Sequence, residues 1–381
     1  MRVLVVNAGS SSLKLRLLAD DGNATRSVDI EDWDGGTGAL SDLSGEARID
    51  AVGHRVVHGG RLFTGPVVVD DEVEAQIESL TSLAPLHQPR ALAGIRAARD
   101  ELSDAPSVAC FDTAFHADLP AAASTYALPA SWRRRWDLRR FGFHGLSHAY
   151  ASRGAASLLD RRLADLRIVT CHLGAGASLC AVLAGHSVDT TMGFTPLEGL
   201  VMATRAGSVD PGLVLWLLAN TKLSVDQVNN ALEHESGLLG LSESTGDLQR
   251  LLQLEVAGDP RARLAISVYA HRLASLVAAM TVSLGGLDVV TFTGGVGENS
   301  SRIRTLAVER LSHLGLAIDQ SLNDAAEGDV DISAPGSGVR VLVLRSREDL
   351  EIARLVRSVV SQGQSGPRRG SSDPGPALGG R

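Results

Sequence analysis

The sequence lacks the cysteine pattern of a disulfide framework or a zinc cluster. Its 381 residues include three cysteines, Cys110, Cys171 and Cys180, which share no CxxC spacing and cannot all pair. It also lacks an excess of positive charge. The formal net charge of -8 argues against a nucleic-acid partner, whose phosphates require clustered Lys and Arg. These absences fit a protein of the reducing cytoplasm that binds no nucleic acid.

Long apolar runs are missing as well. The run before Asn7 is about four residues long, too short for the apolar region of a secretory signal peptide. A run of about 18 uncharged apolar residues, which a membrane span needs, does not appear, so we expect no contact with a membrane. With 44% hydrophobic and 21% charged residues, the composition is that of a globular protein. The length favours two domains of roughly 150 to 200 residues with a cleft between them.

Short β-branched runs alternate with longer helical patterns, which is typical of an α/β fold. The runs that predict strands are residues 3–6, 52–57, 67–69, 168–171, 289–292 and 341–344. Apolar residues three and four positions apart predict helices between them, for instance over residues 266–284. The last twenty residues, 362–381, are rich in Gly, Pro and Ser and predict a disordered tail.

One design occurs twice in the chain. An apolar strand, a polar residue and a Gly-containing turn are followed by Ser-Leu at the start of a second apolar strand. The two copies read VVNAGSSSLKL at residues 5–15 and VTCHLGAGASL at residues 169–179. Glycine-rich hairpins are common, so chance similarity is the alternative to a duplicated fold. We favour duplication, in which each half presents a phosphate-facing hairpin to a shared cleft.

Three glycine-containing turns are candidates for phosphate binding. They are residues 7–12, residues 172–176 and, after a predicted strand, residues 294–299. Glycine lets backbone N–H groups approach phosphates, and nucleotides bind at such strand ends in open α/β sheets. None of the three reads GxxxxGK[ST] or GxGxxG, so the P-loop and Rossmann interpretations fail. The first turn taken alone also fits a plain β-hairpin.

The segments between these turns resemble the acetate kinase family. In order along the chain stand V-x-N-x-G-S-S-S-x-K, GHRVVHGG, FDTAFH, GFHG-x-SH, HLG-x-G, DTTMGFTPLEGL and FTGGVGEN. Several of these motifs are weak singly, but the ordered series is specific. The resemblance runs from residue 1 to about residue 354.

The resemblance implies the fold of the acetate and sugar kinase, Hsp70 and actin superfamily. This is a duplicated, actin-like (ribonuclease H-like) α/β fold of two domains with a nucleotide cleft between them. We expect residues 1–116 with a C-terminal helix at 350–361 to form the first domain. Residues 117–349 then form the second domain, and residues 362–381 the tail. The family usually forms dimers, so a homodimer is expected.

The implied reaction is reversible, direct in-line phosphoryl transfer between ATP and acetate, giving ADP and acetyl phosphate. Such transfer needs charge neutralisation and in-line placement. The resemblance implies that Arg55, His144 and Arg205 converge on the phosphoryl group, and that Arg55 also holds the carboxylate. Asp112 matches the family's essential acidic position. Because acetate has no proton to remove, we interpret Asp112 as orienting an arginine and the metal's water shell.

The resemblance also assigns binding residues. For the adenine nucleotide they are Lys14, His172, Leu173, Gly174, Ala175, Gly176, Asp247, Leu248, Gln249, Gly294, Gly295, Val296, Gly297 and Glu298. Around the acetate methyl group lie Val57, Leu86, Phe143 and Pro196. Asn7 and Glu348 match positions associated with Mg²⁺, which Mn²⁺ could replace, and His87 and His172 are further orienting contacts. Valine at position 57 shortens the pocket, which favours acetate over propionate.

Several positions depart from the usual family pattern. Ala175, Gln88, Ser208 and Gln249 replace Asn, Asn, an acidic residue and Arg respectively, and Arg-Ser-Arg at 345–347 replaces a TNE-like lead into Glu348. Ala175 removes an amide from a phosphate loop, which leaves weaker phosphate binding or another phosphoryl donor open. The alternatives are a propionate or butyrate kinase, or a non-catalytic nucleotide-binding relative. A non-catalytic relative would not need the whole set of implied catalytic residues, Arg55, Asp112, His144 and Arg205.

Overall fold

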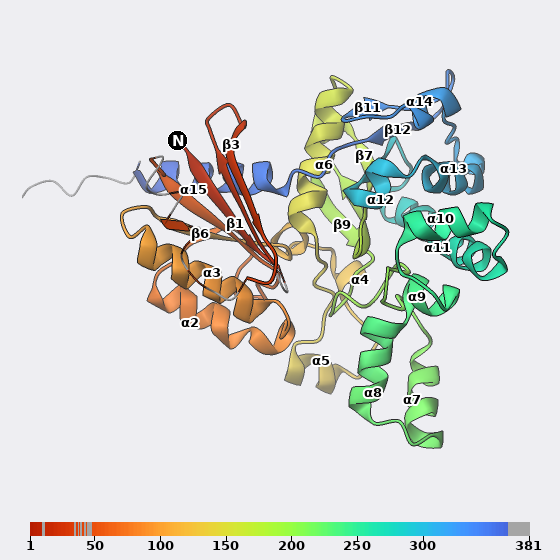
Figure 1. The fold of residues 1–381 in the computed structure, drawn as a ribbon, viewed down its shortest axis with the longest axis horizontal. Helices are drawn as coiled ribbons and strands as arrows, with labels where there is room; N and C mark the ends of the chain where they lie inside the picture. The colour runs from red at the N-terminus through yellow and green to blue at the C-terminus, as the bar shows by residue number, and fades with distance from the viewer. Residues whose placement is uncertain are drawn as a thin grey trace, which may run out of the picture.

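The computed structural model describes residues 1–9, 12–33, 36, 38, 40, 41, 43 and 48–364. Ser10 and Ser11 of the first turn, and residues 365–381 of the expected tail, lie outside the described residues. Two mixed sheets with flanking helices stand side by side in the molecule (Figure 1).

The first sheet has six strands in the order β3-β2-β1-β4-β6-β5. Its strands are β1 (Val3–Ala8), β2 (Leu13–Leu18), β3 (Ala24–Ile30), β4 (Ala51–Val56), β5 (Val67–Val68) and β6 (Ser107–Phe111). Strands β1, β2 and β3 form an antiparallel meander, whereas β1, β4 and β6 run parallel. Every predicted strand of this half is confirmed within one or two residues.

The second sheet repeats this plan, with the order β11-β12-β10-β7-β8-β9. Its strands are β7 (Arg167–Leu173), β8 (Ala177–Leu183), β9 (His186–Thr190), β10 (Val289–Thr293), β11 (Val330–Asp331) and β12 (Arg340–Val343). Here β7, β8 and β9 form the antiparallel meander, and β7, β10 and β12 run parallel. Matching order and direction, strand for strand, confirm the duplicated α/β fold that the two similar hairpins predicted.

Alternation along β1 decides which helix covers which face of the first sheet. Leu4 and Val6 are buried with α3 (Gln88–Glu101), whereas Val3 and Val5 are buried with α15 (Glu348–Gln364). Helix α15 approaches β4 closely at Gly53, where a Cβ atom would lie 2.5 Å from Ile352. The predicted helix 350–361 is thus confirmed, but it continues to Gln364, so residues 362–364 are helical and do not begin a tail.

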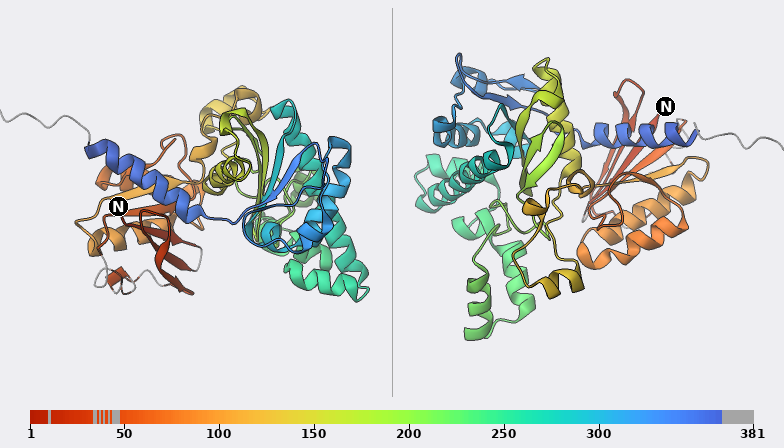
Figure 2. Two further views of the ribbon diagram at one scale, coloured as in Figure 1. Left: turned by 90° about the horizontal axis from the view of Figure 1, so that it is seen from above. Right: turned by 180° about the vertical axis from the view of Figure 1, so that it is seen from behind.

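The second sheet is covered by α6 (Gly145–Leu158) on one face and α11 (Pro260–Leu284) on the other. Helix α6 follows the first sheet in the sequence but packs on the second, and α15 follows the second sheet but packs on the first (Figure 2). The two helices also contact each other. This exchange ties the two halves together along the α6–α15 contact.

The remaining helices surround these layers. They are α2 (Asp71–Ser79), α4 (Ala121–Ser124), α5 (Ala130–Trp136), α7 (Pro211–Asn220), α8 (Val225–Asn230), α9 (Gly237–Ser242), α10 (Leu248–Val256), α12 (Gly294–Asn299), α13 (Ser301–Arg310) and α14 (Gln320–Asp324). Of the described helices, α11 alone is long and apolar enough to cross a membrane by length and composition. Its apolar face is buried against β7 and β8, as expected of a core helix.

Candidate active site

Adjacent parallel strands of the first sheet place Arg55 beside Asp112. In the register of β4 and β6, Val56 lies opposite Phe111, so Asp112 follows at the carboxyl end of β6. The Arg55 guanidinium donates to both carboxylate oxygens of Asp112, with Nη2 to Oδ2 at 2.6 Å and Nε to Oδ1 at 3.1 Å. Glu348, the first residue of α15, lies 3.7 Å from Arg55 Nε. One guanidinium therefore connects both parallel strands to the start of the C-terminal helix.

Burial governs the charges of this cluster. Burial alone lowers the pKa of Arg55, but Asp112 and Glu348 outweigh it and raise that pKa, so the guanidinium is fully charged. The Asp112 side chain is 1% exposed. Burial raises the pKa of this carboxyl group, and the adjacent Arg55 opposes that rise. Asp112 can keep its negative charge in this position only because Arg55 is bonded to it.

His144 stands between the two sheets at the start of α6. Its φ of 56° is left-handed, and the next residue, Gly145, donates its N–H to the carbonyl of Asp112 at 2.9 Å. A Cβ at Gly145 would lie 2.2 Å from that carbonyl oxygen, so glycine is required for this approach. Nδ1 of His144 is hydrogen-bonded to Ser178 at 2.9 Å, across the second sheet's hairpin.

Arg205 approaches the same place from the second half. A Cβ at Gly176 would lie 3.5 Å from Cε1 of His144 and 4.0 Å from Nη1 of Arg205, so both side chains reach one point of the β7–β8 turn. The other end of the guanidinium is fixed by Glu233, with Nε to Oε2 at 2.7 Å. His87 is close enough that the charges of Arg205 and Arg55, after burial, lower its pKa to about 4. Arg55, His144 and Arg205 thus lie close together, and their convergence on a phosphoryl group stays a prediction.

The histidines of the cluster are neutral in this environment. Burial, followed by the neighbouring His172 and Arg55, holds the pKa of His144 well below its usual range. The rings of His144 and His172 lie 4.5 Å apart between centroids. His172 is hydrogen-bonded to Ser147 at 2.7 Å, and burial lowers its pKa. Positive charge in the site therefore belongs to the arginines, which favours an anionic ligand.

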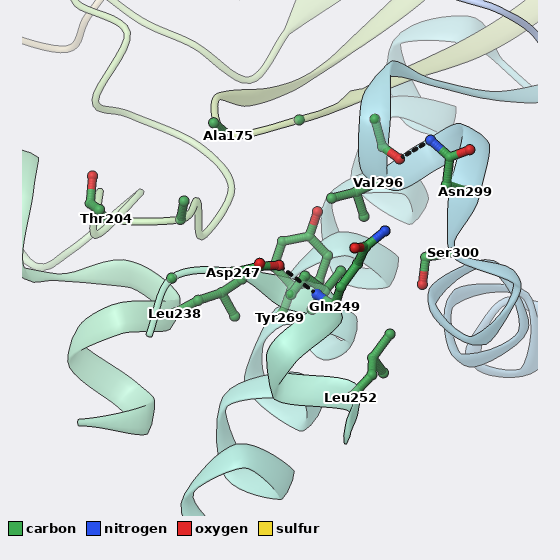
Figure 3. Close-up of a pocket in the computed structure, with 15 residues that line it drawn as sticks. Ala175, Thr204, Leu238, Asp247, Gln249, Leu252, Tyr269, Val296, Asn299 and Ser300 are labelled. Carbon is green, nitrogen blue, oxygen red and sulfur yellow. Dashed lines mark hydrogen bonds between the residues drawn. The ribbon is translucent and has the colours of Figure 1, made fainter. Parts of the chain in front are cut away.

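A cavity of about 560 Å³ opens on the far side of the β7–β8 turn (Figure 3). Its lining is Gly174, Ala175, Ala203, Thr204, Leu238, Gly246, Asp247, Leu248, Gln249, Leu252, Tyr269, Gly295, Val296, Asn299 and Ser300. The turn supplies one wall, α10 another and α12 a third. The Asp247 carboxylate caps α10 by accepting the N–H of Gln249 at 2.8 Å, which fixes the start of that wall.

Seven of the residues assigned to the nucleotide line this cavity, namely Gly174, Ala175, Asp247, Leu248, Gln249, Gly295 and Val296. His172 and Gly176 face the arginine cluster instead. Glu298, also assigned to the nucleotide, accepts the N–H groups of Gly294 and Ser346 with its Oε1 at 3.0 and 2.9 Å. It thereby joins α12 to the segment that leads into Glu348. The turn expected at 294–299 is the short helix α12.

The residues assigned to the methyl pocket differ in how deeply they are buried. Val57 packs against the core cluster that contains Phe143, which is 1% exposed. Pro196 is half-buried, and Leu86 is 54% exposed. The buried Gln88 donates to the carbonyl of His58 at 2.8 Å, and the His58 ring lies 5.4 Å from that of Phe143. Gln88 therefore holds the backbone at His58, whose ring lies beside Phe143 of the proposed methyl pocket.

Lys14 and Asn7 face each other across the first hairpin, in the register of β1 and β2. Lys14 is exposed, and its described charged neighbour is Asp29, whose pKa Arg16 and, less strongly, Lys14 lower. Asn7 is half-buried on β1, one residue beyond the pair of Val6 and His54, and so beside Arg55.

Sequence reasoning missed residues that act from a distance. Glu233, Ser178 and Ser147 hold Arg205, His144 and His172 in place, and Tyr269 lines the cavity. Arg304, 1% exposed, donates to the carbonyls of Gly297 and Glu298 and thereby fixes the end of α12. Glu233, Ser147 and Ser178 lie 25 to 34 residues from the side chains that they hold, so the sequence alone does not pair them. Ser208, one of the departures, accepts the N–H of Gly199 at 3.1 Å.

Comparisons with known proteins agree on one family. Residues 39–354 match the model of the Acetokinase family. The acetate kinase of Synechococcus sp. (strain JA-2-3B'a(2-13)) is 44% identical, over 94% of this chain and 99% of the relative. The acetate kinase of Deinococcus deserti is also 44% identical, over 95% and 98%.

Solved structures give the same result. Porphyromonas gingivalis acetate kinase superposes with a TM-score of 0.88 at 34% identity, covering 94% of this chain and 99% of that one. A propionate kinase from Francisella tularensis superposes with a TM-score of 0.86, also at 34% identity and with the same coverage. The likeness therefore extends over both sheets.

Proposed function

The chain belongs to the acetokinase family and is a kinase, and from this premise we propose that it transfers a phosphoryl group reversibly between ATP and acetate, giving ADP and acetyl phosphate. One observation carries the proposal. The β7–β8 turn lines the large cavity with Gly174 and Ala175, and its next residue, Gly176, faces His144 and Arg205. A nucleotide in the cavity would direct its terminal phosphate around this turn toward the arginines.

The side chains of the cluster have complementary tasks in the proposed transfer. Arg205, held by Glu233, and Arg55, held by Asp112, supply the fixed positive charge that the equatorial phosphoryl oxygens need. Arg55 also binds the carboxylate of acetate. His144 is neutral and contributes a hydrogen bond rather than charge. The transfer needs no general base, because acetate attacks as an anion.

The site also suits a Mg²⁺ ion, for which we propose Asn7 and Glu348. An amide oxygen and a carboxylate are hard ligands of the kind that Mg²⁺ prefers. Within the described residues no cluster of three or more His, Cys, Asp or Glu could hold a metal. When bound, the Mg²⁺ ion would neutralise charge on the phosphates; Mn²⁺ could replace it.

Val57, which packs against the core cluster that contains Phe143, favours acetate over longer acids. We also propose two domains that close on the nucleotide. The first comprises residues 1–116 and 350–361, and the second comprises residues 117–349. The enzyme would work in the cytoplasm as a homodimer. The dimer is supported by α7, whose Leu213, Leu215 and Trp216 are each about half exposed or more. Helix α7 extends away from the two sheets with α8 (Figure 1).

A hydroxylamine trap tests the reaction. The protein is mixed with acetate, MgATP and hydroxylamine, and acetyl hydroxamate is measured. We expect product with acetate, less with propionate and least with butyrate, because one methylene is worth about 1–3 kcal/mol. Parallel reactions with GTP and pyrophosphate show whether Ala175 changes the donor. Confirmed ATP binding without hydroxamate from any C2 to C4 acid would contradict the proposal.

A further inference from the structure

A second, smaller cavity of about 260 Å³ lies where the two sheets are joined. We call it the hinge cavity. It is lined by Thr64, Gly65, Pro66, Phe111, Ala114, Phe115, Gly145, Leu146, Ala149, Arg153, Gly185, Glu351, Arg354 and Leu355. These residues come from β6, α6, α15 and two loops. The cavity is separate from the nucleotide cavity, with which it shares no lining residue.

The charges of the hinge cavity are unequal. Its described lining contains two guanidinium groups, those of Arg153 and Arg354, and one carboxylate, that of Glu351. Both arginines pair with Glu351, which is 2% exposed. Burial and the nearby Arg354 lower the pKa of Arg153 to about 10, as expected where two cations share one anion. One positive charge is thus left without a counter-charge in the wall.

The rest of the wall is apolar. Phe111, Phe115, Leu146 and Leu355 face the same space as the arginines. An apolar cavity with one point of unbalanced charge is the usual design of a small-molecule site, in which the charged group fixes the ligand's orientation. We propose that the hinge cavity binds a small carboxylate with an aromatic or branched apolar body, whose carboxylate lies between Arg153 and Arg354.

Three of the elements that line the hinge cavity, β6, α6 and α15, continue into the reactive cluster. Phe111 precedes Asp112, Gly145 follows His144, and Glu351 lies one turn of α15 after Glu348. A ligand that moves α6 against α15 therefore moves the groups around Arg55. It would change the rate of transfer without competing for acetate. This kinetic consequence rests on the proposed function, whereas binding to the hinge cavity does not.

Binding is measured directly by fluorine NMR on the full chain, with 4-fluorobenzoate as the probe. We expect saturable line broadening with the acid and none with the uncharged 4-fluorobenzamide. Saturating acetate and MgATP should leave the broadening in place. Absence of binding, or displacement of the probe by acetate or ATP, would overturn the proposal.

Variants locate the site. Arg354→Gln and Arg153→Gln should each weaken probe binding at least tenfold, because each removes a charged hydrogen-bond donor. Gly65→Leu fills space without removing charge, since a Cβ there meets nothing within 4 Å, and should abolish binding. Arg302→Gln is the matched control: Arg302 is 51% exposed, as Arg354 is, but lies on α13. Unchanged affinity in the three cavity variants, with folding verified by circular dichroism, would refute the assignment.

Activity separates the two proposals. In the hydroxamate assay, 4-fluorobenzoate should change kcat by at least twofold at a constant KM for acetate in the wild type, and not in Arg354→Gln. Normal kinase activity without probe binding would refute the hinge-cavity proposal and leave the proposed function standing. Probe binding to a protein without any kinase activity would refute the proposed function and leave the hinge-cavity proposal standing.

Discussion

The carboxylate of Asp112 fixes the guanidinium of Arg55. A guanidinium on a flexible side chain is a useful phosphoryl ligand only when its plane is fixed, and two hydrogen bonds to one carboxylate fix it. Glu348 lies near the same edge, 3.7 Å from Nε, which also donates to Asp112. We propose the same division of tasks for Arg205 and Glu233, in which the arginine binds the phosphoryl group and the carboxylate holds the arginine.

A double-mutant cycle tests the role of Asp112. Arg55→Gln should lower kcat/KM on the order of 10³-fold, as loss of an arginine finger does, and Asp112→Asn on the order of 10²-fold. If Asp112 acts through Arg55, adding Asp112→Asn to Arg55→Gln should cost less than about threefold more. Steady-state hydroxamate kinetics measure all four proteins.

The matched control is Asp137→Asn, which alters an arginine–aspartate pair with Arg61 at the surface. It should leave kcat/KM unchanged. Additive losses in the double mutant would assign Asp112 a direct part in the chemistry, independent of Arg55.

The proposed role of Val57 is to limit the length of the acid. Replacing Val57 with Ala would then remove bulk next to the core cluster that contains Phe143 and make room for a longer acid. We expect the ratio of kcat/KM for propionate to that for acetate to rise about tenfold, in line with about 1–3 kcal/mol per methylene. Kinetics with both acids measure it, with the exposed Val68→Ala as control. An unchanged ratio would remove Val57 from the pocket.

The sequence predicted the site residues that stand in a motif. It missed the residues whose partners are set only by packing in the folded chain. Arg55 and Asp112 stand in recognisable blocks, but the strand β6 that precedes Asp112, and with it the register that unites the two residues, was not predicted. Glu233 and Ser178 hold Arg205 and His144 from 28 and 34 residues away. Ser178 lies in the second glycine-containing hairpin, but its partner, like that of Glu233, is decided only when the chain has folded.

At the scale of elements, the strands were the easiest to predict. The strands of parallel sheets that are covered on both faces must be apolar throughout, so β1, β7 and β10 appear as continuous runs. The segment 294–299 was harder. Its glycines suggested a turn, but in the structure it forms α12, whose end Arg304 holds by two carbonyl oxygens. Tertiary hydrogen bonds here outweigh glycine's low helix propensity.

The exposed apolar surface of helix α7 allows the proposed homodimer to be tested. It is apolar along its length, yet none of its residues is buried, and Leu215 and Trp216 are 67% and 57% exposed. A monomer rarely exposes such a surface without a partner. Leu215→Glu should convert a particle of twice 39.9 kDa to a monomer in light scattering after size exclusion, because it places a charge in the interface.

Val256→Glu on α10 is the control, since Val256 is 89% exposed on a different helix of the same half. It should leave the mass unchanged. A wild-type monomer, or a Leu215→Glu variant that stays dimeric, would show that α7 is not the interface.

At the scale of the whole molecule, packing within the two halves and between them buries several histidines. The two sheets stand side by side, and each is covered by a helix from the other half of the chain. His54, His58 and His116 are each at most 1% exposed. Burial lowers the pKa of His54 to about 3 and those of His58 and His116 to about 4. These three rings contribute no charge to the folded state at neutral pH.

Stability should therefore fall on mild acidification. Each of these histidines takes up a proton near pH 6.5 when unfolded but only near pH 3 to 4 when folded. The unfolded state thus binds more protons between these limits, and the free energy of unfolding decreases as pH falls. From pH 6.5 to 5 the decrease is about 1.6 kcal/mol per histidine, because the slope reaches its full value of about 1.4 kcal/mol per pH unit only below pH 6.5, where the unfolded ring is mostly protonated.

Urea denaturation at pH 7, 6 and 5 measures this slope. The window lies above the ordinary range of aspartate and glutamate, so the histidines dominate it. His116→Asn should lower stability at pH 7, because Nδ1 and Nε2 of His116 bond to Ser187 and to the carbonyl of Phe143. It should also make the pH dependence shallower, since one proton-linked group is gone. A free energy of unfolding that is constant from pH 7 to 5 would mean that the buried rings are protonated in the folded enzyme.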